Sequence, residues 1–491
     1  MKKYDDLIKN SLKYAEELGI YLIIRIQQTK GKYVLVNNTK TEEISYNEAA
    51  GIGFHAFTKE GGCGFAATEI HEIENCRRMI KLAADIAFQM EKREGKKNTE
   101  VYRLEPIKDE VFAKVKYPFD YYSLEEAEKK VIALNGEILK SYSNIAIESI
   151  YRQVEDQWRI ARSDGGDVIF NIPRTVFFST ITAKGKKTAT TRAALSGSDS
   201  SILHDDDKVE ILHKRIHNAC SLAIDLLEAN MVKGGNYKIV MDYALAKGLA
   251  HEAFGHAVES DGLKTSILGN EDGSFKKGVE VAMPIVSIID EAKEGDYAYQ
   301  PYSANGIKRR RVEIIKDGVL KEALADIFSA AEANVEVTGA GRLESFRHIP
   351  IPRMSNIRIE VKDPIELDKA IEDVKPEEIY KILLENNIAK EDEEILYLVG
   401  YKGGQVKPSQ GEFVFNCSGI YKLGKETTLY QPAIFSGNIL SALKSIIAAI
   451  GPLQLDAQGT CGKFGQQVPS SGGSHYFVVM EANKDIIIGG E

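Results

Sequence analysis

Cysteine, tryptophan and long apolar runs are scarce in this chain. It contains five cysteines and one tryptophan among 491 residues. A small and odd number of cysteines predicts reduced thiols and argues against a disulfide framework. The most apolar stretches, such as 21–26 and 446–450, are far shorter than the roughly 20 residues of a membrane-spanning helix. The first residues, MKKYDDLIKN, carry charges where a secretory signal needs an apolar core, so we expect a cytoplasmic protein.

A surplus of basic charge is missing as well. The chain has 72 acidic residues against 63 lysines and arginines, which gives a formal net charge of -9. Proteins that bind duplex nucleic acid normally carry a basic surplus, so we expect no nucleic-acid partner. No basic amphipathic segment indicates binding to a membrane surface. Hydrophobic residues make up 43% and charged residues 27% of the chain, which is typical of a globular protein.

The apolar pattern changes near residue 230. Before it, helical spacing alternates with short strand-like segments, and the helices are expected at 4–18, 72–91, 124–141 and 208–230. After it, strand-like runs dominate. We therefore predict an α+β fold: an N-terminal domain (1–230) with helices and antiparallel strands, and a β-rich C-terminal domain (231–491). The charged stretch 92–120 is expected to be a connector that could divide the first domain into two subdomains.

Residues 242–262, DYALAKGLAHEAFGHAVESDG, contain the main chemical motif. Asp242 is a suitable N-cap and Gly262 a suitable stop, so the pattern predicts one helix that carries His251 and His256. Zinc peptidases commonly space two histidines four residues apart, on one helical face. Here the spacing is five, which leaves the side chains ~140° apart in a regular α-helix. One π-type turn would bring them closer into line, and Gly255 is well placed to permit it.

A catalytic zinc site needs a third protein ligand and an open position for water. Glu259 and Asp261 are local candidates, Glu259 could instead orient a histidine ligand, and a distant residue could also complete the site. Glu252 follows the first histidine directly, where a general base for water is required. By itself the pattern could also be a structural pair.

Four segments together resemble a known family. HEAFGHAVESDG is followed by GAGRLESFRHIPIPRMSN, GGQV and GTCGKFGQ, and this order is similar to that of the TldD/PmbA metallopeptidases. The resemblance is strongest from about 235 to 470 and weak over the first 230 residues. It implies that His251, His256 and Cys461 bind one zinc ion per chain and that Glu252 is the general base. Because the inactive PmbA type lacks the motif, the chain resembles the active TldD type.

The resemblance also implies a function. The expected protein is a cytoplasmic zinc-dependent peptidase that hydrolyses short or unfolded peptides through a metal-activated water. It would act as a heterodimer with a PmbA-like homologous subunit or as a homodimer, with neither nucleic acid nor a membrane as partner. The substrate-binding residues are unknown. The alternative is a non-catalytic regulatory or binding subunit of such a complex, although a purely structural zinc site would not need Glu252. A metal-dependent hydrolase of non-peptide amides is a third reading.

Other polar clusters give weaker signals. His213 and His217 are expected on a solvated helix face, and Arg309–Arg311 at a solvated strand edge. His475 is expected at the surface or at a strand edge. Arg353 and His348 lie in a family-like segment and could contact substrate or stabilise an oxyanion.

Overall fold

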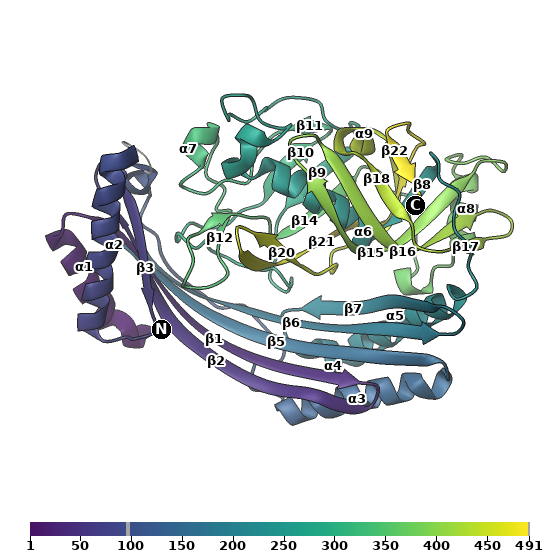
Figure 1. Cartoon of the computed structure of the whole chain (residues 1–491), viewed down its shortest axis with the longest axis horizontal. Helices are drawn as coiled ribbons and strands as arrows, with labels where there is room; N and C mark the ends of the chain where they lie inside the picture. The colour runs from purple at the N-terminus through teal and green to yellow at the C-terminus, as the bar shows by residue number, and fades with distance from the viewer. Residues whose placement is uncertain (95–98, 490–491) are drawn as a thin grey trace.

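Two large β-sheets with their helices form the molecule in the computed structural model, which describes residues 1–94 and 99–489 (Figure 1). One sheet belongs to the N-terminal half and the other to the β-rich C-terminal half, so the predicted α+β class is confirmed. The first sheet ends at Gly197 and the second begins at Lys238, while the domain boundary at 230 stays a prediction.

The N-terminal sheet has seven strands in the order β3-β2-β1-β5-β6-β4, with β7 paired to β6. Their bounds are β1 Tyr21–Asn37, β2 Lys40–Phe57, β3 Cys63–Thr68, β4 Lys108–Val111, β5 Ile145–Arg162, β6 Asp167–Lys184 and β7 Thr188–Gly197. All neighbours are antiparallel except β4 and β6. β4 lies within the stretch 92–120 expected to be a connector; residues 95–98 of that stretch lie outside the described residues.

The helices of this half are α1 Asp5–Glu17, α2 Ile73–Glu94, α3 Leu124–Ser141, α4 Ser201–His204 and α5 Asp206–Asp225. α3 has the predicted bounds because Ser123 and Glu126 form a capping box at its start. α5 ends at Asp225, well before the predicted end at residue 230.

The two faces of the N-terminal sheet have different partners. Side chains alternate between the faces of a strand. Leu22 and Ile24 of β1 pack in a core with α1 and α2, whereas Ile23 packs with Tyr302 and Ile327 of the C-terminal half. The C-terminal half therefore lies over one face of the curved sheet, as Figure 1 shows.

The C-terminal sheet is mixed, with strand order β11-β10-β9-β14-β21-β8-β15-β16-β18-β22; β17 pairs with β16, and β19 and β20 pair with β21. The strand bounds are β8 Lys238–Asp242, β9 Val286–Asp290, β10 Val312–Lys316, β11 Val319–Leu320, β14 Asn356–Val361, β15 Ile395–Lys407, β16 Glu412–Leu423, β17 Thr428–Tyr430, β18 Ile434–Asn438, β19 Ile446–Gln454, β20 Gly459–Lys463, β21 Gln466–Met480 and β22 Ile486–Ile488. A separate two-stranded ribbon joins β12 Gly341–Arg342 to β13 Ile351–Pro352.

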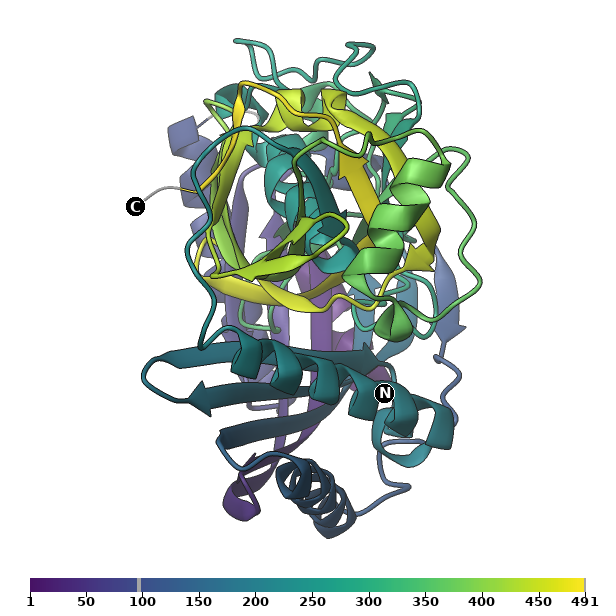
Figure 2. The ribbon, with the colours of Figure 1, turned by 90° about the vertical axis from the view of Figure 1, so that its right-hand side faces the viewer.

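This sheet curves around one buried helix, α6 Tyr243–Gly248, which follows β8 directly (Figure 2). The other helices of this half are α7 Ala330–Ala333, α8 Pro376–Glu385 and α9 Ile439–Lys444. The apolar side chains of α6 and of the turns after it form one core with the surrounding strands. Within the described residues, no helix has both the length and the apolar character needed to cross a membrane.

Candidate metal centre

The helical segment after β8 starts as predicted and then changes its winding. Asp242 caps it, because its side chain accepts a hydrogen bond from the Leu245 amide at 2.8 Å. After α6 the chain makes a π-helical stretch, Leu249–Gly255, and then a 3-10 turn, His256–Val258. The prediction of one helix ending at Gly262 is therefore wrong. The chain becomes extended at Glu259, where φ is -67° and ψ is 121°.

Gly255 allows the π-helical stretch to lie close to β14. A Cβ atom at this position would be 2.3 Å from Met354 Sδ and 3.3 Å from Ile357 Cδ1. Both are buried core side chains with little room to move. A side chain at position 255 would therefore displace Met354 from its place in the core.

Replacing Gly255 by alanine is expected to lower the free energy of unfolding by about 1–3 kcal/mol, because the added methyl overpacks a dense core. Gly262→Ala is the matched control, since a Cβ there meets nothing within 4 Å. Urea unfolding of both variants measures the difference. Equal stability of the two variants would show that the contact with Met354 is easily relieved.

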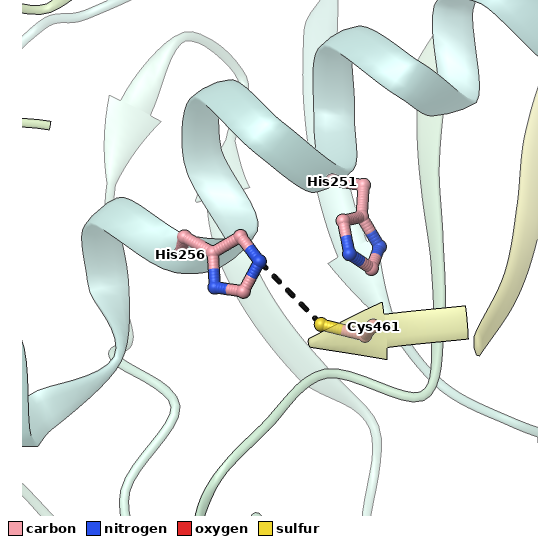
Figure 3. A group of neighbouring side chains, drawn as sticks. All are labelled: His251, His256 and Cys461. Carbon is pink, nitrogen blue, oxygen red and sulfur yellow. Dashed lines mark hydrogen bonds between the residues drawn. The ribbon is translucent and has the colours of Figure 1, made fainter. Parts of the chain in front are cut away.

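Three of the predicted site residues converge on one point (Figure 3). His251, His256 and Cys461 each offer a ligand atom, and these atoms all lie within 4.8 Å of one another. His256 Nε2 is 3.4 Å from Cys461 Sγ, although the two residues are 205 positions apart in the chain. The imidazole centroids of the two histidines are 5.2 Å apart. The change in helical winding thus coincides with a geometry in which both rings face the same sulfur.

The hairpin of β20 and β21 brings Cys461 to the helix. One end of β21 pairs with β8, with Val478 opposite Met241, immediately before α6. The other end of β21 pairs with β20, with Val468 opposite Cys461. The same strand therefore anchors the start of the helix and carries the cysteine back over its later turns.

The site has a buried side and a more open side. His251 and Cys461 are 3% and 1% exposed. Glu252 and His256 are partly exposed. Glu252 Oε1 accepts a hydrogen bond from the Tyr401 hydroxyl at 3.5 Å. The accessible surface of the site therefore belongs to Glu252 and His256 and not to His251 or Cys461.

The two local ligand candidates have other partners. Glu259 Oε2 lies 3.0 Å from His256 Nδ1 and accepts a hydrogen bond from Lys463 Nζ at 2.8 Å. Asp261 also accepts from Lys463, at 2.6 Å. With Nδ1 held by Glu259, His256 directs Nε2 toward Cys461. This geometry favours the orienting role considered for Glu259.

The charges in the site influence each other strongly. Burial lowers the pKa of His251 well below its usual value, which keeps the imidazole neutral as metal binding requires. Burial also opposes the charge on His256, but Glu259 and Cys461 outweigh it and raise the His256 pKa to about 10. Burial alone would raise the pKa of Cys461. The hydrogen bond and charge of His256 outweigh burial, so the pKa of the thiol is lowered. Burial raises the pKa of Glu252, which favours proton transfer near neutral pH.

Three basic side chains surround this centre, and two of them, Lys463 and Lys247, were not singled out from the sequence. Lys463 could have been expected, because it lies two positions after Cys461 and side chains two apart on a strand share a face. Arg353, considered as a substrate contact, is fully buried and donates to the Cys461 carbonyl oxygen. Lys247 is buried one helical turn before His251, and its Nζ is 3.3 Å from Ser470 Oγ.

The other histidines and the arginine run predicted at the surface differ in how far they are buried. His475 is 6% exposed, lies in β21 opposite Leu453 and has its Nδ1 2.8 Å from the Gly451 carbonyl oxygen, so of the two expected positions the one at the surface is wrong. Arg309 is not solvated either, since its guanidinium lies 3.3 Å from buried Asp290, whereas Arg310 and Arg311 are exposed as expected. His217 is partly buried against Tyr142, with 3.1 Å between Nδ1 and the hydroxyl. His348 Nδ1 lies 3.0 Å from Ser345 Oγ.

Replacing Glu259 by glutamine is expected to lower zinc affinity about 10–100-fold, because a ligating histidine loses the carboxylate that fixes its orientation. Competition with a chromogenic chelator measures the affinity. Glu271→Gln, in an exposed loop, is the control and should bind zinc as the parent does. An unchanged affinity in the Glu259 variant would show that His256 needs no such partner.

Family models match most of the chain. The model for the PmbA/TldA metallopeptidase central domain matches residues 117–227, and the model for the C-terminal domain of the same family matches residues 234–471. The chain belongs to the PmbA/TldD family of metallopeptidases. The family expected from the sequence motifs is thus confirmed, and the match reaches into the N-terminal half, where the motif resemblance was weak.

Curated relatives carry metalloprotease names. A metalloprotease of Methanocaldococcus jannaschii is 28% identical over 478 residues, which cover 93% of this chain and 95% of that protein. A zinc metalloprotease TldD homolog of Saccharolobus solfataricus is 26% identical over 256 residues, covering 51% of this chain and 52% of that protein. These names support a metallopeptidase with a metal cofactor.

Solved structures share the whole fold. The crystal structure of TldE from Thermococcus kodakarensis superposes with a TM-score of 0.72 at 15% identity, and covers 99% of this chain and all of that one. At this identity the likeness concerns the fold alone.

Proposed function

We propose that this protein is a cytoplasmic, zinc-dependent peptidase that hydrolyses short or unfolded peptides. The observation that supports this most directly is the convergence of His251, His256 and Cys461, with Glu252 next to His251 in the chain. Two imidazoles and a thiolate leave one position of a tetrahedral zinc site open for water, as in catalytic sites.

The donor atoms fit one zinc ion per chain. His251 Nδ1 is buried and has no hydrogen-bond partner among the described residues, which is costly unless a ligand is bound there. His256 would bind through Nε2 with loss of a proton, since Glu259 holds Nδ1 and the pKa of the ring is raised. Cys461, whose pKa is lowered, offers a thiolate.

Glu252 supplies the acid–base step in this proposal. Bound at this centre, zinc would lower the pKa of a water molecule and polarise the peptide carbonyl. Glu252 accepts the proton of that water as its oxygen bonds to the carbonyl carbon. Glu252 then delivers this proton to the leaving nitrogen as the carbon–nitrogen bond breaks, which yields one carboxylic acid, carrying the second proton of the water, and one amine.

The proposed partner is a PmbA-like homologous subunit or a second copy of this chain. The likeness in fold between this chain and TldE from Thermococcus kodakarensis supports a partner that is a homologue. The alternative function, a non-catalytic regulatory or binding subunit, would leave a partly exposed acid beside the centre without a role. Hydrolysis of non-peptide amides would use the same groups.

Metal analysis and a cleavage assay on one preparation test the proposal. We expect about one zinc per chain and cleavage of an unfolded polypeptide such as reduced casein, by the protein alone or co-purified with a PmbA-like homologue. Bound zinc without cleavage under either condition would favour the binding-subunit alternative. Cleavage of small amides but not of peptides would favour the third reading.

A further inference from the structure

Tyr401 reaches the candidate metal centre from an irregular position in β15. The pairing of β15 with β16 shifts register between Tyr401 and Gly403. Gly400 and Gly403, on either side, have φ angles of +69° and +120°. A β-bulge changes the direction of a side chain, and such bulges are frequent next to active sites. The irregularity therefore determines where the Tyr401 ring points.

The ring is fixed against the metal-site helix. A Cβ atom on Gly248 would lie 2.8 Å from Tyr401 Cδ2 and Cε2, so only glycine leaves room for the ring there. On another side the ring meets Phe415 edge-on, with centroids 5.7 Å apart and an angle of 84°. Glycine at Gly248 and the bulge in β15 thus place the ring one helical turn from Glu252.

The hydroxyl of Tyr401 has one partner among the described residues, Glu252 Oε1 at 3.5 Å. This distance is longer than an ordinary O–H···O hydrogen bond, so the contact is a long one. Burial raises the pKa of Tyr401 far above neutral, so the hydroxyl keeps its proton and acts as a donor.

The exposure of these groups places them on one side of the centre. Tyr401, Glu252 and His256 are partly exposed, whereas His251 and Cys461 are buried. The tyrosine therefore contacts the base among the partly exposed groups of the centre and not among its buried ones.

We infer that Tyr401 is a positioning residue for Glu252: its hydroxyl holds the carboxylate in the orientation that accepts a proton from the attacking water. This inference rests on the proposed peptidase function. A hydrogen bond to a charged group restricts the carboxylate rotamers, and its loss leaves the base present but misoriented. The ring stays in place when only the hydroxyl is removed.

Tyr401→Phe tests the inference. We expect kcat for peptide cleavage to fall about 10–100-fold, the effect of losing one hydrogen bond to a charged group, with KM and zinc content unchanged. In a Glu252→Gln background the same substitution should lower residual cleavage much less, because the two residues act as one unit.

A binding measurement gives a readout that does not depend on turnover. Calorimetric titration of the zinc-loaded protein with a peptide hydroxamate, whose hydroxyl proton a neighbouring carboxylate accepts, should show about 10-fold weaker binding in Tyr401→Phe. The matched control is Tyr397→Phe on the same strand, where the ring packs on Tyr421 and Phe477. This control should match the parent in both assays.

The possible results distinguish a failure of the role of Tyr401 from a failure of the proposed peptidase function. If the parent cleaves peptides and binds hydroxamate but Tyr401→Phe behaves as the parent does, the role of Tyr401 is overturned and the proposed function stands. If Tyr401→Phe raises KM and leaves kcat unchanged, the hydroxyl contacts substrate and does not position Glu252. If the parent itself neither cleaves peptides nor binds hydroxamate, the proposed function and the inference both fail.

Discussion

Replacing Glu252 by glutamine is expected to leave zinc bound and to lower kcat for peptide cleavage about 100–10,000-fold, the usual contribution of a general base. Glutamine has nearly the same size as glutamate, but its amide cannot accept the proton of the attacking water. Glu252 is partly exposed and lies outside the group of His251, His256 and Cys461, so the metal should remain. Peptide cleavage rates and metal content, measured on one preparation, test both halves of this expectation.

A second glutamine variant controls for unspecific effects. Glu332→Gln changes an exposed carboxylate on α7 and should cleave at the parent rate. Zinc-loaded Glu252→Gln with the activity of the parent would refute the mechanism. A variant that loses its zinc would instead assign Glu252 a part in metal binding.

The fold class could be predicted because apolar residues follow helical spacing in the helices and form strand-like runs in the β-rich half. α3 has the predicted bounds, since its capping box is local and lies next to its apolar stripe. The helix expected over 242–262 ends earlier, in a 3-10 turn followed by extended backbone at Glu259. Gly255 packs on Met354 of another segment, and no local pattern encodes that contact.

The histidine pair of the candidate site could be predicted from local sequence, whereas Cys461 and Tyr401 could not. The five-residue spacing of His251 and His256 required an unusual helical geometry, and a π-helical stretch occupies the positions between them. Cys461 could be selected only through the family resemblance, because its place depends on the pairing of β21 with both β8 and β20. Tyr401 was missed for the same reason, since a β-bulge far along the chain sets its direction.

Removing the Cys461 side chain should have the largest effect on the metal. Binding free energies of about 10–16 kcal/mol for structural zinc are shared by four ligands, so losing one should weaken binding on the order of 100–1,000-fold. Cys461→Ala should therefore contain far less than one zinc per chain after dialysis against a chelator, and should lose peptide cleavage. His256→Ala should lose zinc in the same way.

Cys417 provides the matched control for this loss. It is as buried as Cys461, but it lies in β16 within the apolar core, and its Sγ contacts the Ala433 carbonyl oxygen at 3.5 Å. Cys417→Ala creates a small core cavity and should keep its zinc, whereas Cys461→Ala should not. Equal zinc content in the two variants would mean that the thiol near His256 does not bind the metal. In that case Glu259, 3.0 Å from His256 Nδ1, would be the next residue to test as the third ligand.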